Sequence, residues 1–598
     1  MNKYMLERIR FFMMIVLLVM LLLVARLAWL QIYRHDYYFA KAENNRTREL
    51  PVTAARGEIY DRHGELLAGS RPGFTVSLLD FPKHDRPEVI RFLSELLKME
   101  EGLIQKKIAA QRFRTFAPIR LKNDVSAEVV AKIRERQLEL PGVIIETEPV
   151  RHYPSGSLAA HVLGYVGEIG PEQLRRLAEQ GISYRSGDNI GVFGLERAWE
   201  QTLRGQDGRL IVETNRYGQR VRVLGKKNPI PGGRLHLTLD ARLQRIVEQA
   251  FSETVTAARQ QGNDQAGRGA VVILNPNNGE ILAMASIPAY NPNTISKDID
   301  ALNADPNSPQ KNRVIRGGYP AGSTLKMLGA VAGLEEGVLG EKTRIICTGR
   351  KIFFRGERPR ACFRGTAHGA LNVVEALAKS CNIFFFELAL RLGIDTLERY
   401  AHDLGFGQPT GLLDIEGEEP GVFDSRNSRR SRNVRWNIGD VLSVAIGQAD
   451  TQITPLQLAN YAAMLANGGL HYRPRLLQSV TDYRGETVYR AEPEVLRRLL
   501  YNEETWRVVR QGMEAVTLPG GTAASLRQLP VRLAGKTGTA ETGVQGTDRR
   551  PHSLFVGYAP AEAPEIAIAV IVEHVETGTV VPLVARIISE YYQSEAKK

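Results

Sequence analysis

An uncharged apolar run near the N-terminus, FFMMIVLLVMLLLVA (residues 11–25), constrains this chain more than any other feature. Such a run suits a membrane-spanning helix, although it is slightly shorter than the about 20 residues of an ideal span. It becomes long enough if Arg26 extends its side chain to the interface and Trp29 and Tyr33 anchor there. The sequence therefore predicts a single transmembrane helix over residues 11–33.

Positive charges set the expected orientation of this helix. Lys3, Arg8 and Arg10 precede the run, so the positive-inside rule predicts a cytoplasmic tail over residues 1–10 and an exported remainder. A cleaved signal peptide is the alternative, but no convincing small-x-small cleavage site follows the run. No later stretch is apolar enough to span a membrane. We therefore expect a single-pass protein of the inner (cytoplasmic) membrane, with its main body periplasmic or otherwise extracytoplasmic.

Composition limits the function of the exported part. The chain has 598 residues, 43% of them hydrophobic and 24% charged, which is typical of several globular domains and excludes wholesale disorder. Its net charge of +12 would suit nucleic acid, an anionic membrane surface or an acidic polymer. Because export makes nucleic acid an unsuitable partner, we interpret the arginine-rich stretch 425–436 as a solvated loop or a contact for an anionic polymer.

Turn residues and periodicity divide the exported part in two. Residues 51–70 alternate around a turn as in a β-hairpin, and residues 84–140 have a mostly helical pattern. A proline/glycine break, NPIPGG, precedes a new unit that holds a second predicted hairpin over residues 269–293. We place the boundary near residue 235, giving domains over residues 34–235 and 236–598.

A serine and a lysine three residues apart, Ser323 and Lys326, stand where a small, apolar helix is predicted to begin. Residues three apart share a helix face, so the lysine amine is expected within reach of the serine hydroxyl. Taken alone the pair reads as a helix cap with a solvated lysine. Ser308/Lys311 and Ser594/Lys597 also match S-x-x-K, but neither pair opens an apolar helix. The pattern therefore needs partner motifs.

Two such motifs follow in order. S-x-N occurs as Ser380 and Asn382 at the start of an apolar helix, and K-T-G occurs once, beginning at Lys536, in a predicted antiparallel edge strand. Together the three motifs resemble those of the penicillin-binding, serine-acyltransferase class.

The chemistry of that class accounts for the residue types. Ser323 is the expected nucleophile, and Lys326 can take its proton if desolvation and cationic neighbours keep the amine neutral. Ser380 is expected to pass a proton toward the leaving amine. Asn382 is expected to hold the substrate amide and to orient Lys326.

The K-T-G segment is expected to bind substrate. Lys536 offers positive charge for a carboxylate, Thr537 and Thr539 offer hydroxyls, and Gly538 lets an extended peptide lie close to the strand. The oxyanion hole is expected between the backbone N–H groups of Ser323 and Thr539.

Over essentially its full length the chain resembles class B penicillin-binding proteins, and among them the rod-shape elongation type. The resemblance rests on RGEIYDRHGELLA, HVLGYVGEI, GVFGLERAWEQTLRG and the segment 447–469. It implies a non-catalytic, dimerisation-type α+β pedestal over residues 34–235. It also implies an α/β transpeptidase domain over residues 236–598, an antiparallel sheet flanked by helices as in serine β-lactamases. One departure is Ala449, where glycine is expected.

The resemblance also implies the substrates and partners. These are the stem peptides of peptidoglycan, with release of terminal D-alanine, β-lactams as inhibitors, and a membrane complex containing a SEDS-family glycosyltransferase and other elongation proteins. No organic cofactor is expected. The alternatives are the division-specific transpeptidase, a D,D-carboxypeptidase or β-lactamase, and a sensor or silent scaffold. A hydrolase lacks a persuasive E-x-x-x-N element here, a sensor needs a larger cytoplasmic output, and a scaffold would usually lose a catalytic residue.

The cysteines leave a separate question open. Cys347, Cys362 and Cys381 lie in one segment with His368. An exported protein favours a disulfide, for which Cys347 and Cys362 are the natural pair, but this leaves Cys381 alone. A zinc site would use all four residues, and the resemblance supports it, because some elongation-type relatives hold a metal here. Free buried thiols are the third possibility. In a zinc site, Cys381 would brace the S-x-N motif with its side chain turned away from that motif.

Overall fold

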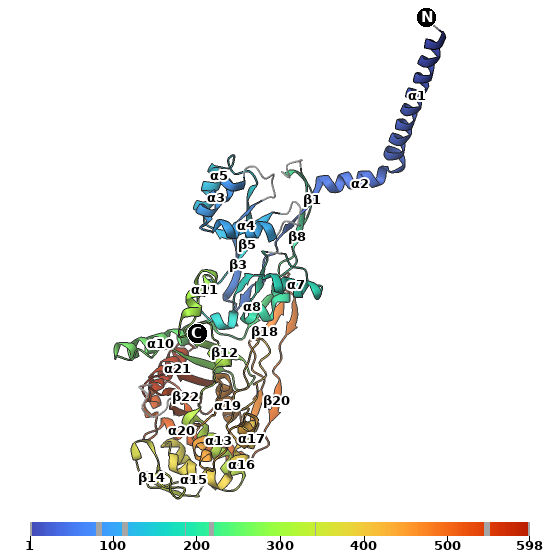
Figure 1. Ribbon diagram of the computed structural model, residues 1–598. Coiled ribbons are helices and arrows are strands. Elements are labelled where there is room, and N and C mark those ends of the chain that lie inside the picture. Colours follow the sequence, from blue (N-terminus) through green and yellow to red (C-terminus); the bar gives the residue numbers. More distant parts are fainter. Residues whose placement is uncertain are drawn as a thin grey trace. The chain divides into compact units, whose positions relative to one another are not determined.

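The computed structural model describes residues 3–78, 86–110, 118–185, 187–214, 220–340, 342–542 and 550–595. The chain forms two compact units, each made of several stretches of sequence (Figure 1). Unit 1 contains Met1–Ala55, Arg71–Val150 and Gly205–Pro231, and unit 2 contains Arg56–Ser70, Arg151–Arg204 and Gly232–Lys598.

The N-terminal apolar run is helical. Helix α1 (Lys3–Ala28) continues as the π-helical turn η1 (Trp29–Tyr33), and α2 (His35–Arg46) follows. Within the described residues, Lys3–Tyr33 is the one helical segment long and apolar enough to cross a membrane, with a mean hydropathy of 2.8 over its most apolar 18 residues. None of the side chains in its apolar window is buried against protein. The helix is therefore compatible with a single-pass membrane anchor.

Unit 1 is an α+β structure, as expected. Strands β1 (Thr47–Val52), β8 (Gly208–Thr214) and β9 (Arg220–Lys227) form one antiparallel sheet. The second half of β3 (Leu66–Leu78) pairs with β4 (Ile119–Val125) and β5 (Val143–His152). Helices α3 (Arg86–Leu97), α4 (Glu101–Ala110) and α5 (Ala127–Glu135) share a core with these strands.

Unit 1 contains one strand that the sequence analysis did not predict. Residues 84–140 have a mostly helical pattern, yet β4 lies between α4 and α5. Ile119 and Leu121 of β4 are buried while Arg120 and Lys122 are only partly covered. This alternation with a period of two is too short to stand out among longer helical repeats.

A buried ion-pair network joins the distant sequence stretches of unit 2. The carboxylate of Glu196 has no exposed side-chain surface and pairs with both Arg56 and Arg151, the latter at 2.5 Å. Tyr153 donates a hydrogen bond to the same carboxylate at 3.2 Å, and Arg56 also pairs with Glu200 at 2.8 Å. Two of the segments that carry the family resemblance, those around Arg56 and Glu196, therefore meet in one network.

Unit 2 holds a sheet in which four strands follow the order β19-β18-β10-β2. They are β2 (Ile59–Tyr60), β10 (Arg234–Leu237), β18 (Leu477–Thr481) and β19 (Thr487–Arg490). Strands β2 and β10 pair in parallel, whereas the other pairs are antiparallel. Strand β2 also pairs with the first half of β3, which confirms the hairpin predicted over residues 51–70.

The main sheet of unit 2 has five antiparallel strands in the order β12-β11-β23-β22-β21. They are β11 (Gly269–Leu274), β12 (Ile281–Ile287), β21 (Ala534–Ala540), β22 (His552–Ala559) and β23 (Ile566–Val572). The structure confirms the hairpin predicted over residues 269–293 as β11 and β12. It also places K-T-G in the edge strand β21, as predicted.

Both faces of this sheet are covered, which explains its continuous apolar sequences. In β23 the residues Ile566, Ile568 and Val570 belong to the core that contains α10 (Ala241–Gln260) and α21 (Val580–Glu595). The alternate residues Ala567 and Ala569 belong to the core on the other face, which contains α19 (Pro455–Asn467). Small alanines there allow α19 to pack close to the sheet. Sheet and helices together give the predicted fold class.

The remaining elements of unit 2 are mostly short. They are α6 (Ala160–Leu163), β6 (Val166–Glu168), α7 (Pro171–Glu179), β7 (Asn189–Gly191), α8 (Gly194–Ala198), α9 (Glu200–Leu203), α11 (Ile295–Ala304), α12 (Arg313–Arg316), η2 (Gly322–Leu325), α13 (Lys326–Glu335), β13 (Ile345–Cys347), β14 (Arg350–Lys351), β15 (Arg360–Ala361), η3 (Phe363–Gly365), β16 (Gly369–Leu371), α14 (Val373–Ala378), α15 (Asn382–Leu392), α16 (Ile394–Asp403), α17 (Arg426–Ser431), α18 (Asp440–Ala445), β17 (Leu470–Tyr472), β20 (Val495–Arg498), α20 (Glu503–Thr517) and η4 (Ala524–Gln528).

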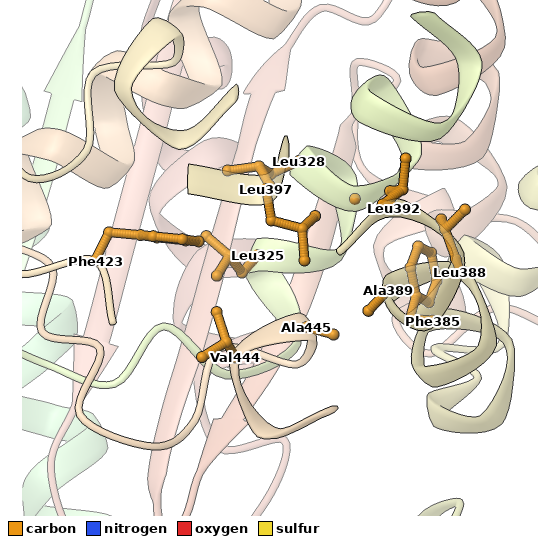
Figure 2. A pocket seen from close by; sticks show the side chains of 11 residues that line it. Leu325, Leu328, Phe385, Leu388, Ala389, Leu392, Leu397, Phe423, Val444 and Ala445 are labelled. Carbon is orange, nitrogen blue, oxygen red and sulfur yellow. The ribbon is translucent and has the colours of Figure 1, made fainter. Parts of the chain in front are cut away.

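An apolar layer supports helix α13 from behind. Figure 2 shows Leu325 and Leu328 facing side chains of α15, α16 and α18, among them Phe385, Leu397 and Val444. The cavity between them measures about 10 Å³. A water molecule needs roughly 10–15 Å³ and polar partners, so this apolar gap stays dry.

We expect this layer to contribute strongly to stability. Leu328→Ala removes a side chain that is 2% exposed and enlarges the existing cavity, so it should cost about 2–5 kcal/mol of unfolding free energy. Leu413→Ala is the control, because Leu413 is 73% exposed and its loss should change stability by less than about 0.5 kcal/mol. Thermal unfolding of the full chain measures both. Equal melting temperatures for the two variants would contradict this account of the layer.

Candidate active site

Ser323 lies in a tight turn that opens a buried helix. The 3₁₀ turn η2 holds Ser323, and the backbone N–H of Lys326 donates to the Ser323 carbonyl before α13 begins. The structure thus confirms a helix start close to Ser323. Ser323 is partly accessible, whereas Lys326 is fully buried.

Glycines let three backbone segments meet beside Ser323. The N–H of Gly322 donates to the carbonyl of Gly447 at 2.9 Å. Gly322 has φ +56°, and a Cβ on it would lie 2.6 Å from the Thr539 carbonyl oxygen and 3.3 Å from the Thr539 nitrogen. A Cβ on Gly447, at φ +69°, would lie 2.2 Å from the Gly322 oxygen. The peptides of Ser323 and Thr539, expected to form the oxyanion hole, are therefore held close together.

The Lys326 amine joins the first two motifs. It donates to the Asn382 side-chain oxygen Oδ1 at 2.7 Å, to the Ser380 carbonyl at 2.7 Å and to Ser380 Oγ at 3.2 Å. These three acceptors match the three donors of an ammonium group. The S-x-x-K lysine and the S-x-N pair thus form one constellation.

The backbone at Ser380 is unusual and explains how it serves Lys326. Ser380 links α14 to α15 with φ +52°, a left-handed conformation that costs a residue other than glycine about 1–2 kcal/mol. This conformation is compatible with both of its oxygen atoms facing the same amine. Such strain is common where surrounding structure fixes a functional geometry.

Asn382 begins α15 and is held from two sides. Its Oδ1 accepts from Lys326, and its Nδ2 donates to the Ala361 carbonyl of β15 at 3.0 Å. The amide orientation is therefore fixed by its partners. Ala361 precedes Cys362, so the cysteine segment directly contacts the S-x-N motif.

The K-T-G residues lie along β21. Lys536 is fully buried and donates to the Thr537 carbonyl at 2.9 Å, and the Thr537 hydroxyl is 2.7 Å from that of Thr522. A Cβ on Gly538 would lie 2.9 Å from Thr324 Cγ2. The absent side chain of Gly538 therefore faces the turn that carries Ser323, a reason for glycine besides room for a substrate.

Two buried lysines shape the electrostatics. Burial lowers the pKa of Lys326 to about 7, although the nearby Cys381 and Cys362 groups oppose this shift. Burial, and then the charge of Lys326, hold the pKa of Lys536 well below its usual range. A substantial fraction of Lys326 is consequently neutral near pH 7 and able to accept a proton.

This pKa predicts the pH dependence of acylation. Protonated Lys326 cannot act as a base, so the rate of reaction with penicillin should rise about tenfold per pH unit below about pH 7 and level off above it. Stopped-flow acylation of the full chain across this range measures the profile. A rate independent of pH between about 5.5 and 8 would exclude Lys326 as the base.

Sequence reasoning assigned no role to residues 447–449. Gln448 donates from Nε2 to the Thr539 carbonyl at 3.4 Å, so the turn after α18 contacts both Gly322 and β21. The glycine at position 447 was the one available sequence signal of this contact, because a backbone position with φ > 0 favours glycine. Ala449 follows with φ +62°, at the position where the family resemblance predicts glycine.

The cysteine segment forms a compact cluster. Cys347 Sγ lies 3.5 Å from Cys362 Sγ and 3.5 Å from His368 Nδ1, and Cys362 Sγ lies 3.7 Å from Cys381 Sγ. The four ligand atoms all lie within 4.8 Å of one another, and all three cysteines are free. A hydrogen bond with the Cys381 thiol lowers the pKa of Cys362 to about 5, and the same contact raises that of Cys381.

Known proteins match the chain over both units. Residues 269–590 match the family described as "Penicillin binding protein transpeptidase domain", and residues 51–237 match "Penicillin-binding Protein dimerisation domain". The peptidoglycan D,D-transpeptidase MrdA of Acinetobacter baumannii is 34% identical over 99% of this chain and 88% of its own length.

Solved structures also align with the chain over most of its length. Penicillin-binding protein PBP2 of Helicobacter pylori, in a complex with MreC, aligns with a TM-score of 0.76 at 26% identity, over 92% of this chain and 100% of that chain. A chain from a structure titled "Structural coordination of polymerization and crosslinking by a peptidoglycan synthase complex" aligns with a TM-score of 0.72 at 30% identity, over 98% of both chains.

The chain therefore belongs to the penicillin-binding transpeptidases, the class that its sheet, its Ser323 turn and its K-T-G strand define. Within that class it is a class B protein of the penicillin-binding protein 2 group. Its activity is that of a serine-type peptidoglycan D,D-transpeptidase of cell elongation.

Proposed function

We propose that Ser323 forms an acyl-enzyme with the stem peptide of peptidoglycan. Ser323 Oγ attacks the carbonyl between the two terminal D-alanines while Lys326 takes its proton, and the terminal D-alanine leaves with a proton relayed through Ser380. The observation that carries this proposal is the buried Lys326 amine, which contacts both residues of S-x-N. An amine of a second stem peptide then attacks the acyl carbonyl, which forms the cross-link and releases Ser323.

The remaining motif residues bind the substrate and stabilise the tetrahedral intermediate. The bound terminal carboxylate favours the protonated form of Lys536, which pairs with it, and Thr537 and Thr539 supply hydroxyls along the strand. The N–H groups of Ser323 and Thr539 stabilise the oxyanion of the tetrahedral intermediate. The close approach of Gly322 to the Thr539 peptide supports this assignment.

Cross-linking of lipid-linked glycan chains that carry pentapeptide stems tests the proposal. The full chain should yield cross-linked muropeptide dimers and free D-alanine, and Ser323→Ala should yield neither. Trimmed, uncross-linked stems as the sole product would mean hydrolysis instead of transfer. Dimers formed by Ser323→Ala would refute the choice of nucleophile.

We further propose that Cys347, Cys362, His368 and Cys381 bind a structural zinc ion. In a tetrahedral site, Zn–S bonds of about 2.3 Å separate two sulfurs by about 3.8 Å, and a sulfur and a nitrogen by about 3.5 Å. The two sulfur–sulfur distances of 3.5 and 3.7 Å and the sulfur–nitrogen distance of 3.5 Å fit these values. Bound zinc would supply only structure, and it would brace the segment whose Ala361 carbonyl holds Asn382.

Metal analysis tests the zinc site. The chain purified without chelator should contain about one zinc ion, and Cys362→Ser should lose it, because a missing ligand weakens the site. The exposed His402 lies outside the cluster, so His402→Asn should keep the metal. Zinc removal should also lower the melting temperature. Metal-free protein with unchanged stability after zinc addition would contradict the proposal.

The membrane arrangement and partners rest on sequence and family. We propose a pedestal domain over residues 34–235 and a transpeptidase domain over residues 236–598. We also propose a cytoplasmic tail and an extracytoplasmic body. This orientation is supported by Lys3, Arg8 and Arg10, which precede the apolar run. The related structures with MreC and in a peptidoglycan synthase complex support an elongation assembly that includes a SEDS glycosyltransferase. The chain should stimulate glycan polymerisation by that partner in liposomes. The unchanged chain and Ser323→Ala should stimulate it equally. No stimulation by either form would refute this partner.

A further inference from the structure

A polar cleft of unit 2 lies on one face of the sheet β19-β18-β10-β2, and none of its lining residues belongs to the Ser323 site. The strand register brings four side chains into one row. Tyr60 pairs with His236, His236 pairs with Ser479, and Ser479 pairs with Arg490. Paired residues share a sheet face, so this row crosses four strands.

Two stacked rings form one end of the row, and of these two only His236 lines the cleft. The rings of Tyr60 and His236 stack with centroids 5.4 Å apart and an interplanar angle of 13°. His236 Nε2 also lies 3.4 Å from the Thr481 hydroxyl oxygen. Partial burial and the charge of Arg234 lower the pKa of His236, which keeps the ring neutral at pH 7.

An anchored arginine forms a wall of the cleft. Arg475 pairs with Glu280 at 2.9 Å and donates from Nη1 to the Ala491 carbonyl at 2.9 Å. Its Nε is shielded from solvent and has no hydrogen-bond partner among the described residues. A buried donor without a partner is costly, so the pairing of this guanidinium is incomplete.

The cleft has the size and charge of a site for a polar, uncharged ligand. Its volume of about 440 Å³ falls within the roughly 300–1,000 Å³ typical of small-ligand sites. Its lining combines Glu280 and Glu492 with Arg475 and Arg490, so the formal charges balance. Neither a strong anion nor a strong cation is favoured by such a lining.

We propose that this cleft binds a segment of the carbohydrate strand of peptidoglycan. Planar carboxylates, amides and guanidinium groups can each contact two neighbouring hydroxyls, and an aromatic face suits the apolar face of a sugar ring. A peptide would instead be expected to add to a strand edge through its backbone, whereas this cleft lies on a sheet face. The inference rests on the proposed function, which brings the protein to its glycan substrate.

Binding of a GlcNAc–MurNAc tetrasaccharide whose lactyl carboxyl groups are capped as simple amides, and which is therefore uncharged, to the full chain in detergent tests the proposal. Arg490→Ala and Glu492→Ala remove exposed lining residues, so they should leave folding intact and weaken binding by at least about tenfold. Arg484→Ala, in the turn between β18 and β19 and outside the cleft, is the control and should bind normally.

Penicillin labelling is measured in parallel and separates the two proposals. All variants should label at Ser323 as the unchanged chain does, because the cleft shares no residue with that site. The cleft assignment is overturned by absence of saturable tetrasaccharide binding, by equal binding in all variants, or by complete competition from penicillin. If the unchanged chain binds the sugar but is not labelled by penicillin, the result counts against the proposed catalytic function and not against the cleft.

Discussion

Replacing Lys326 with alanine should slow acylation by penicillin about 10²–10⁴-fold, the usual contribution of a general base. A single group, the lysine amine, contacts both Ser380 and Asn382, with bonds of 2.7–3.2 Å. Its removal therefore deletes the proton acceptor and also releases two positioned side chains. Acylation rates with a fluorescent penicillin, compared with melting temperatures, measure the effect.

Lys326→Arg separates proton transfer from charge. Arginine keeps the positive charge but cannot become neutral near pH 7, so it should acylate as slowly as alanine does. A rate for the folded arginine variant within about tenfold of the original would show that a fixed charge suffices, and would contradict a base role.

Substitution of Gly538 should have the second large effect. In Gly538→Ala the new Cβ would lie 2.9 Å from Thr324 Cγ2 and 3.2 Å from the Ala321 carbonyl oxygen. Because Thr324 is fully buried, either its side chain or the strand must then shift, which disturbs the turn that carries Ser323. Because a displacement of about 1 Å in a catalytic geometry can cost about 10²-fold, acylation should fall by that order.

A glycine in open surroundings provides the control. A Cβ on Gly340 would meet Thr343 Oγ1 at an ordinary 3.6 Å, so Gly340→Ala should acylate normally. Acylation kinetics and melting temperatures are compared for both variants. Normal acylation by Gly538→Ala would show that β21 does not need to approach the Ser323 turn this closely.

Local chemistry made the catalytic motifs predictable. The chemistry of acyl transfer requires residue types such as those of Ser323, Lys326 and the K-T-G motif. The neighbouring residues predict the helix and the strand on which these residues lie. The turn sequence within residues 269–293 likewise predicted a hairpin that the structure contains. Such features depend on sequence neighbours, which a single sequence displays.

Features made by distant segments were not predictable in this way. The contacts of Gly447 and Gln448 with Gly322 and β21 join residues more than 90 positions apart in sequence. Residues 56–70 and 151–204, which lie far apart in the sequence, meet at the buried Glu196 network of unit 2. Apart from the glycine at position 447, no local pattern marks either arrangement, because the energy comes from tertiary packing.

The cysteine segment lies between these cases. The residue types suggested zinc, but the spacing from Cys347 to Cys381 left a disulfide and free thiols open. Folding brings all four ligand atoms within 4.8 Å of one another. The β13–β16 hairpin and the start of α15 create that proximity, and neither could be positioned from sequence alone.

The most direct test of the central claim is the site of covalent attachment of penicillin. The full chain is incubated with penicillin, its intact mass is measured, and the acylated peptide is sequenced by mass spectrometry. We predict one penicillin per chain, attached to Ser323, and no adduct in Ser323→Ala. Attachment to another serine, such as Ser308 or Ser594, or an undiminished adduct in Ser323→Ala, would contradict the assignment of Ser323 as the nucleophile.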